Sequence, residues 1–190
     1  EYGNLVGLLW GVAIGGVAPW VGKSFAPMGP LDQRQVAGAA IPENVPACRG
    51  INHFNIIQQA PVNVALNTIL RFMWHLKDAP ESERQKYGHE RDGGHFAAYR
   101  AFSICDRTPR DVFLLNYRFM GLQNQPPLTF LIDEVVEIAD GLFLGQLLFA
   151  TDRLLERYDP LAKKEVYRYQ HFGYFLLFRE DWNAEAKRLF

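Results

Sequence analysis

FLIDEVVEIADGLFLGQLLFA, residues 130–150, contains two short runs rich in apolar residues on either side of Asp140-Gly141. An Asp-Gly pair favours the tight turn that joins two antiparallel strands. Because side chains alternate between the faces of a strand, one face of 130–138 is expected to carry Phe130, Ile132, Glu134, Val136 and Ile138. The stretch therefore predicts a β-hairpin, with a carboxylate among the apolar side chains of its first strand.

The same alternation extends outward from this hairpin. Residues 96–104, 112–119 and 166–180 have the period of strands, and DRTP (106–109) and NQPP (124–127) are typical of turns. The series predicts an antiparallel meander over 96–180, rolled into a barrel or a sandwich. With further pieces near 23–25 and 34–41 the chain has seven or eight strands, and about eight strands close around one small ligand.

One amphipathic helix is expected inside this β protein. Apolar residues recur at helical spacing from Val62 to Lys77, after Pro61, and the charged stretch at 79–94 is typical of a solvated loop. The fold class is therefore mainly β with helical additions. We expect a single barrel domain at 23–190 with a helical insertion at 61–94.

The chain opens with GNLVGLLWGVAIGGVAPWVGKSF (3–25), which has no charge before Lys23. Its uncharged run at 5–21 is at the short end of what crosses a bilayer as a helix. Small residues spaced four apart let a second helix approach closely in a membrane, and Trp10 accompanies this stripe of Gly7, Gly11 and Gly15. The segment at 1–22 predicts either an apolar helix that docks in a membrane or a glycine-rich helix buried on the domain.

Composition narrows the classes of partner. The net charge is −1, which does not favour a nucleic-acid partner. Two cysteines, Cys48 and Cys105, are too few for a disulfide framework. They could pair, but two buried, unpaired thiols are expected. Aromatic residues make up 14% of the chain, and such side chains line apolar cavities.

Three blocks carry a resemblance to a known family: PWVGKSF at 19–25, CDRTPRDVFLLNYR at 105–118 and IDEVVEIADGLFLGQLLF at 132–149. They resemble a largely uncharacterised family of bacteria and photosynthetic eukaryotes with W-x-G-K-x-F and D-E-x(5)-[PD]-G-L-[YF]-L-G motifs. Ile132 and Asp140 depart from that pattern, and 61–94 is an insertion relative to it. The resemblance implies a lipocalin-like (calycin) barrel and no activity. Lipocalins stack an early Trp on a basic residue late in the last strand, so we expect either that Trp20 stacks on Arg179 or that Arg179 is simply solvated.

Glu134 is the most unusual candidate site residue, because a carboxylate on an apolar strand face needs a partner. Arg100, Arg118 and Gln146 are the candidate partners, with Gln146 on the apolar face of 142–150. One interpretation is that Glu134 is a polar group at the floor of a ligand cavity, or a general acid. The other is that it forms a structural ion pair, or that the strand register differs from the expected one. A ligand-binding set follows from the first: Glu134, Gln146, Tyr117, Phe113, His171 and Arg118.

GHERDGGH (88–95) places His89, Glu90, Asp92 and His95 close together but without the regular spacing of a helical metal motif. We expect a solvated loop and no metal site there. No catalytic motif or cofactor fingerprint is apparent, so no catalytic residue is assigned and the cofactor is unknown.

Three functions fit these features. The first is a membrane-associated calycin-like protein that binds an apolar small molecule or lipid. The second is a non-catalytic accessory subunit that docks on a membrane-protein helix through its N-terminal segment. The third is an isomerase or hydrolase acting on a lipid-like substrate.

Overall fold

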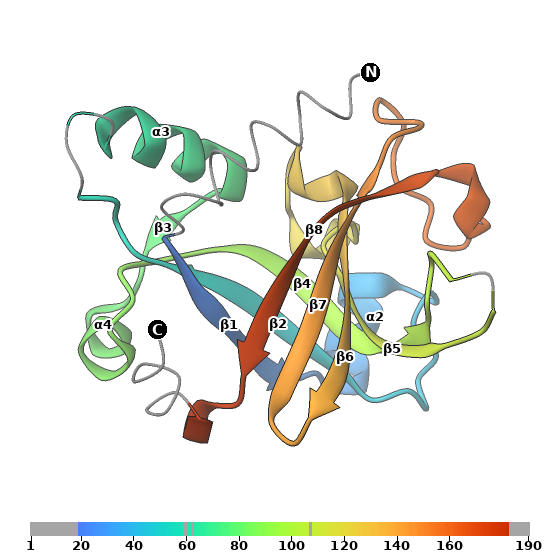
Figure 1. Cartoon of the computed structure of the whole chain (residues 1–190). Coiled ribbons are helices and arrows are strands. Elements are labelled where there is room, and N and C mark those ends of the chain that lie inside the picture. The colour runs from blue at the N-terminus through green and yellow to red at the C-terminus, as the bar shows by residue number, and fades with distance from the viewer. Residues whose placement is uncertain (1–18, 59–60, 62, 107, 183–190) are drawn as a thin grey trace.

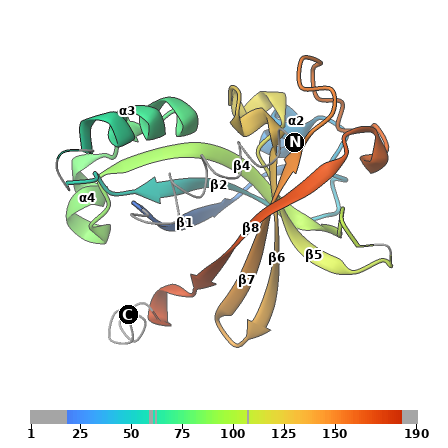
Figure 2. The ribbon, with the colours of Figure 1, turned by 45° about the horizontal axis from the view of Figure 1, so that its top comes forward.

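The computed structural model describes residues 19–58, 61, 63–106 and 108–182, which form one strongly curled antiparallel sheet (Figure 1). The strands follow the order β1-β2-β4-β5-β6-β7-β8, and the short β3 pairs with β4 beside this path. Their bounds are β1 (Trp20–Pro27), β2 (Ala47–Phe54), β3 (Lys77–Asp78), β4 (Arg91–Phe102), β5 (Asp111–Asn116), β6 (Leu131–Ala139), β7 (Leu142–Ala150) and β8 (Tyr169–Phe178). In Figure 2 the layer of β1, β2 and β4 is crossed by β6, β7 and β8, so the sheet forms a half-barrel.

Three short helices surround the sheet: α2 (Pro30–Ala37), α3 (Asn63–Trp74) and α4 (Glu81–Tyr87). Single turns of 3-10 helix occur at Met120–Leu122, Leu128–Phe130, Lys164–Val166 and Glu180–Trp182. Proline opens α2, and Gly38 ends it with φ of 61°, a left-handed value that costs glycine little. The strand expected at 34–41 is therefore wrong, since this start and stop enclose a helix instead.

The predicted meander is confirmed. Strands β4 to β8 are sequential antiparallel neighbours, and the hairpin of β6 and β7 turns at Asp140-Gly141. β4 begins at Arg91, earlier than expected, and the insertion at 61–94 holds α3, β3 and α4 rather than one helix. The chain is thus a mainly β half-barrel, compatible with a calycin-like fold.

The N-terminal segment was predicted to be helical over 1–22. Residues 1–18 lie outside the part of the chain that the structure describes, so most of that prediction is not addressed. Trp20, Val21 and Gly22 belong to β1, where Trp20 pairs with Phe54 and Gly22 with His53 of β2, so a helix cannot extend to residue 22. Within the described ranges, none of the helices combines the length and apolar character needed to cross a membrane.

The core lies on both faces of the sheet. Inside the curl, one cluster includes Phe54, Phe96, Leu115 and Leu131. On the outer face a smaller cluster joins Val112, Leu114 and Ile132. The first five residues of β6 are therefore buried on both faces, so that Asp133 on the inner face and Glu134 on the outer face are both removed from water.

Candidate binding cavity in the half-barrel

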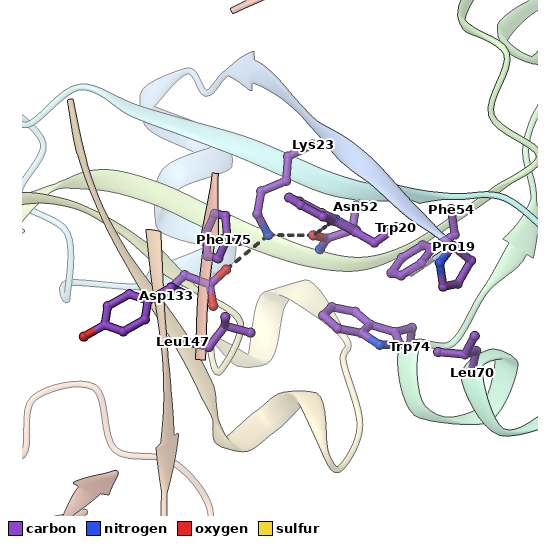
Figure 3. A pocket seen from close by; sticks show the side chains of 11 residues that line it. Pro19, Trp20, Lys23, Asn52, Phe54, Leu70, Trp74, Asp133, Leu147 and Phe175 are labelled. Atoms are coloured by element: carbon purple, nitrogen blue, oxygen red, sulfur yellow. Dashed lines mark hydrogen bonds and ion pairs between the residues drawn. The ribbon is translucent and has the colours of Figure 1, made fainter. Parts of the chain in front are cut away.

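A cavity of about 60 Å³ lies inside the curl, between the first and last strands of the sheet and α3 (Figure 3). Most of its wall is apolar: Pro19, Trp20, Phe54, Leu70, Trp74, Leu147, Tyr174 and Phe175 contribute to it. Trp20 of β1 meets Phe175 of β8 edge-on, with ring centroids 5.6 Å apart. Lys23, Asn52 and Asp133 supply the polar part of the lining.

The Lys23 amine is the centre of that polar part. β1 places Lys23 opposite Asn52 of β2, and its side chain is only 3% exposed. Its Nζ lies 2.6 Å from Asn52 Oδ1, 2.6 Å from the Tyr117 hydroxyl and 3.1 Å from Asp133 Oδ2. Because an ammonium has three N–H donors, these acceptors satisfy the whole group.

Neighbouring polar groups extend this network. The Tyr117 hydroxyl donates to Asp133 Oδ2 at 2.9 Å, and Trp20 Nε1 donates to Asn52 Oδ1 at 3.2 Å. The Asn52 amide nitrogen donates to the Gly94 carbonyl at 2.7 Å. The rings of Trp20 and Phe175 lie 5.4 Å and 5.1 Å from Lys23 Nζ, within range of cation–π attraction. The cation is therefore held by hydrogen bonds and by ring faces together.

Among the described residues, the two carboxylate oxygens of Asp133 differ in their hydrogen bonds. Oδ2 accepts from Lys23 and Tyr117, whereas Oδ1 is buried and has no hydrogen-bond partner among the described residues. In Figure 3 the second oxygen points away from Lys23, on the side of Leu147. An unsatisfied buried acceptor costs free energy unless a donor reaches it. A ligand with an N–H or O–H group would supply that donor.

Burial governs the ionisation of these groups. It lowers the pKa of Lys23, and the Asp133 carboxylate opposes this by attracting the charged amine. Burial also raises the pKa of Asp133, which Lys23 and Tyr117 counteract, and raises the pKa of Tyr117 well above 10.0. Burial therefore disfavours both charged forms, and contacts within the cluster offset part of this effect.

This coupling predicts a pH dependence of stability. Since the pKa of Lys23 is lowered from 10.5 in the folded state, the unfolded chain binds more protons in the window below 10.5. The free energy of unfolding should then rise with pH across that window. Asp133→Asn removes the attraction that supports the charged amine, so the rise should begin at a lower pH in this variant. Urea titrations in a pH series up to about 9, where ordinary tyrosines are still mostly protonated, measure both profiles, and identical profiles would contradict the coupling.

Glu134 meets an amide partner, as predicted, but on the other face of the sheet. Its carboxylate accepts from the Ser103 hydroxyl at 2.9 Å, from Gln146 Nε2 at 2.8 Å and from the Ile104 backbone N–H. Glu134 and Gln146 are cross-strand neighbours, and neither lines the cavity. Sequence alternation failed here because both faces of this part of β6 are buried.

The remaining predicted site residues are distributed around the fold. Tyr117 lies behind the cavity as a partner of Lys23 and Asp133, and Phe113 packs against the inner core. His171 is exposed, with its ring 4.3 Å from that of Tyr174. Arg118 is buried outside the cavity, where it donates to Tyr169 and lies 4.0 Å from the Tyr158 ring. Only Tyr117 of this predicted set belongs to the polar cluster.

The stacking of Trp20 on Arg179 is not found. Arg179 is exposed and forms ion pairs with Asp140 and Asp181 at 2.9 Å and 2.8 Å. Lys23 is the cation that approaches the Trp20 ring, because β1 directs it inward, whereas Arg179 follows the end of β8. Both cysteines are free, but neither is buried as expected, since Cys48 is half-buried and Cys105 is exposed.

Sequence reasoning missed Lys23, Asn52 and Asp133 as a site. The signal for Asp133 was its place between Leu131 and Val135, which alternate onto the inner core. Lys23 was visible as the first charge after the apolar opening segment and as the lysine of the W-x-G-K-x-F motif, neither of which assigns it to a site. Nothing in the sequence around Asn52 indicates that it faces either of them.

The fold and this cavity define a class: a mainly β half-barrel with a buried lysine–aspartate pair at the end of an apolar cavity. No protein-family model matches the chain, and comparisons with curated proteins and with solved structures give no significant match.

Proposed function

We propose that this protein binds a small apolar molecule that carries one hydrogen-bond donor. The observation that carries the proposal is the position of Asp133 Oδ1 beside an apolar cavity, without a hydrogen-bond partner among the described residues. Apolar walls with a few placed polar groups are the usual composition of a ligand site. The half-barrel would then serve as a calycin-type container in which β1 and β8 approach through Trp20 and Phe175.

The size of the cavity restricts the ligand. A buried water needs about 10–15 Å³ measured in the same way, so about 60 Å³ holds a group of only a few non-hydrogen atoms. The ligand is therefore a short molecule, or the polar end of a longer lipid whose chain leaves between β1, β8 and α3. In either case the donor binds Asp133, and the apolar part contacts Trp20 and Trp74.

Short alcohols and ethers test this proposal. Pentan-1-ol and butyl methyl ether have the same number of non-hydrogen atoms, but only the alcohol has a donor. We expect the alcohol to change the tryptophan fluorescence and to bind about tenfold more tightly than the ether, since one hydrogen bond to a charged group is worth about 1.5–3 kcal/mol. Equal binding of the two would show that Asp133 does not select the ligand.

A cavity-filling variant provides the control. Leu147→Phe adds volume at the cavity wall, where Leu147 pairs with Asp133 across β6 and β7, and it should abolish binding of the alcohol. Leu155→Phe makes the same change at a fully exposed loop position and should leave binding unchanged. Circular dichroism checks that both variants stay folded, and binding retained in a folded Leu147→Phe variant would place the ligand elsewhere.

We also propose that the protein is associated with a membrane or a membrane-protein helix through its N-terminal segment. Pro19, where the described chain begins, lines the cavity, so an anchored segment would hold the cavity near a lipid surface. On the neighbouring α3, Val64, Ile69 and Phe72 are exposed, which suits contact with lipid.

Membrane association has its own test. The protein should co-purify with the membrane fraction, and Gly11→Leu should release it without changing the circular dichroism of the barrel, because the larger side chain blocks close helix packing. Association that is unchanged in this variant would argue against docking through the glycine stripe.

The accessory-subunit hypothesis remains as the second candidate. It is favoured by the small cavity, since most of the barrel interior is filled by side chains such as Phe96 and Tyr117, and by the exposed apolar residues of α3. The alcohol experiment distinguishes the two proposed functions, because an accessory scaffold would bind neither the alcohol nor the ether. Such a scaffold would still lose its membrane association in the Gly11→Leu variant.

A further inference from the structure

Two histidines and an aspartate gather on the face of the sheet opposite the cavity. His53 follows Asn52 on β2, so its side chain points away from the cavity. Asp92 of β4 is the cross-strand neighbour of His53. Gly88, with φ of 78°, ends α4, and His89, just before β4 begins at Arg91, lies beside these two residues. The fold thus joins positions that are far apart in the sequence.

The nitrogen and oxygen atoms of this cluster lie close to one another. Asp92 Oδ1 is 2.6 Å from His53 Nδ1 and 3.0 Å from His89 Nε2. One ligand atom from each of the three residues falls within 4.8 Å of the other two. Glu83 of α4 has Oε2 at 3.8 Å from His89 Nε2, so a second carboxylate borders the cluster.

His89 is the most deeply buried member of the cluster, at 3% exposed. Its Nε2 lies 3.0 Å from Asp92 Oδ1 but forms no well-directed hydrogen bond with it or with another described residue. Buried polar atoms are nearly always paired, and a metal ion bound by both residues would satisfy this nitrogen.

We propose that His53, His89 and Asp92 bind one divalent transition-metal ion, with Glu83 or a water as the fourth ligand. Imidazole and carboxylate suit zinc and its first-row neighbours. Tetrahedral zinc with bonds of about 2.0–2.2 Å separates its ligand atoms by about 3.3–3.5 Å, so the present distances from Asp92 to the histidines need to open by less than about 1 Å. The ion replaces the close contact between the Asp92 oxygen and each imidazole.

The expectation of no metal site considered only neighbours in sequence. It tested His89, Glu90, Asp92 and His95 for spacing, whereas His53 comes from another strand. Three protein ligands with an open fourth position are typical of zinc sites that also bind a water or substrate. This site is separate from the cavity, although β2 carries residues of both.

Zinc titration of the purified, metal-stripped protein tests the proposal. We expect one Zn²⁺ per chain by calorimetry, a raised melting temperature with excess Zn²⁺, and a visible absorption band with Co²⁺ in its place. His53→Gln and Asp92→Asn should each weaken Zn²⁺ binding by more than about 100-fold, because even the loss of an outer partner typically costs about 10–100-fold. Glu83→Gln should weaken it by about tenfold.

His95→Gln is the matched control, since His95 lies on β4 close to Asp92 but is not part of the cluster. It should leave Zn²⁺ affinity and stoichiometry unchanged. The proposal is overturned if the wild-type protein binds no Zn²⁺, if His53→Gln binds it as tightly as the wild type, or if His95→Gln weakens binding as much as His53→Gln. Circular dichroism of each variant without metal separates loss of a ligand from loss of the fold, and Asp92→Asn keeps the side-chain shape if His53→Gln unfolds.

Discussion

Lys23→Met is expected to lower the free energy of unfolding by about 3–5 kcal/mol, the usual cost of removing one partner from a buried ion pair. The variant leaves the Asp133 carboxylate buried without its cation and removes the donor that Asn52 and Tyr117 accept from. Urea denaturation measures the loss. Lys77→Met is the control, because Lys77 is exposed on β3 and surface changes usually stay within about 0.5 kcal/mol.

The double variant Lys23→Met/Asp133→Leu sharpens this test. Replacing both members of a buried pair by apolar residues is often close to neutral, so the double variant should recover most of the stability lost in Lys23→Met. It should also lose the preference for the alcohol over the ether, since the acceptor is gone. A double variant as unstable as the single one would mean that the stability comes from the other bonds of Lys23 rather than from its charge.

Glu134→Gln is expected to cost about 1.5–3 kcal/mol, the range for hydrogen bonds to a charged group. The Glu134 carboxylate accepts from three donors, on Ser103, Ile104 and Gln146. An amide has one oxygen and an NH₂ group, so at least one of these donors would face another donor. The segment at 103–106, which Glu134 ties to β6, should be the first to loosen, and amide hydrogen exchange at Ile104 reports it.

Glu137→Gln on the same strand is the matched control for this change. Glu137 is exposed and accepts only a 3.2 Å bond from the Gly141 backbone N–H. We expect its effect on stability to be within about 0.5 kcal/mol. Equal losses in the two variants would show that burial of Glu134 does not set the cost.

Much of the fold was predictable because its signals are local. Asp140-Gly141 specified the turn of the β6–β7 hairpin, and turns near 106–109 and 124–127 separated the strands of the meander. The helix at 62–77 was visible from its period and appears as α3. The strand predicted at 34–41 was wrong because the helix start and stop signals of α2 outweighed its short apolar run. The start of β4 was also misplaced, since this strand begins at Arg91 and not at residue 96.

The sequence by itself determined the class, an antiparallel meander with one amphipathic helix, because turn residues and strand alternation act between near neighbours. Only the tertiary structure decided the sites. Lys23 meets Asn52, Tyr117 and Asp133 across separations of 29, 94 and 110 residues, and His53 meets Asp92 across 39. Strand alternation could not show whether Asp133 or Glu134 faces the cavity. Both faces of this part of β6 are buried, so both carboxylates lie among apolar residues in the sequence. Which carboxylate faces the cavity depends on which way the sheet curls, and the curl brings β1 beside β8 and Lys23 to Asp133.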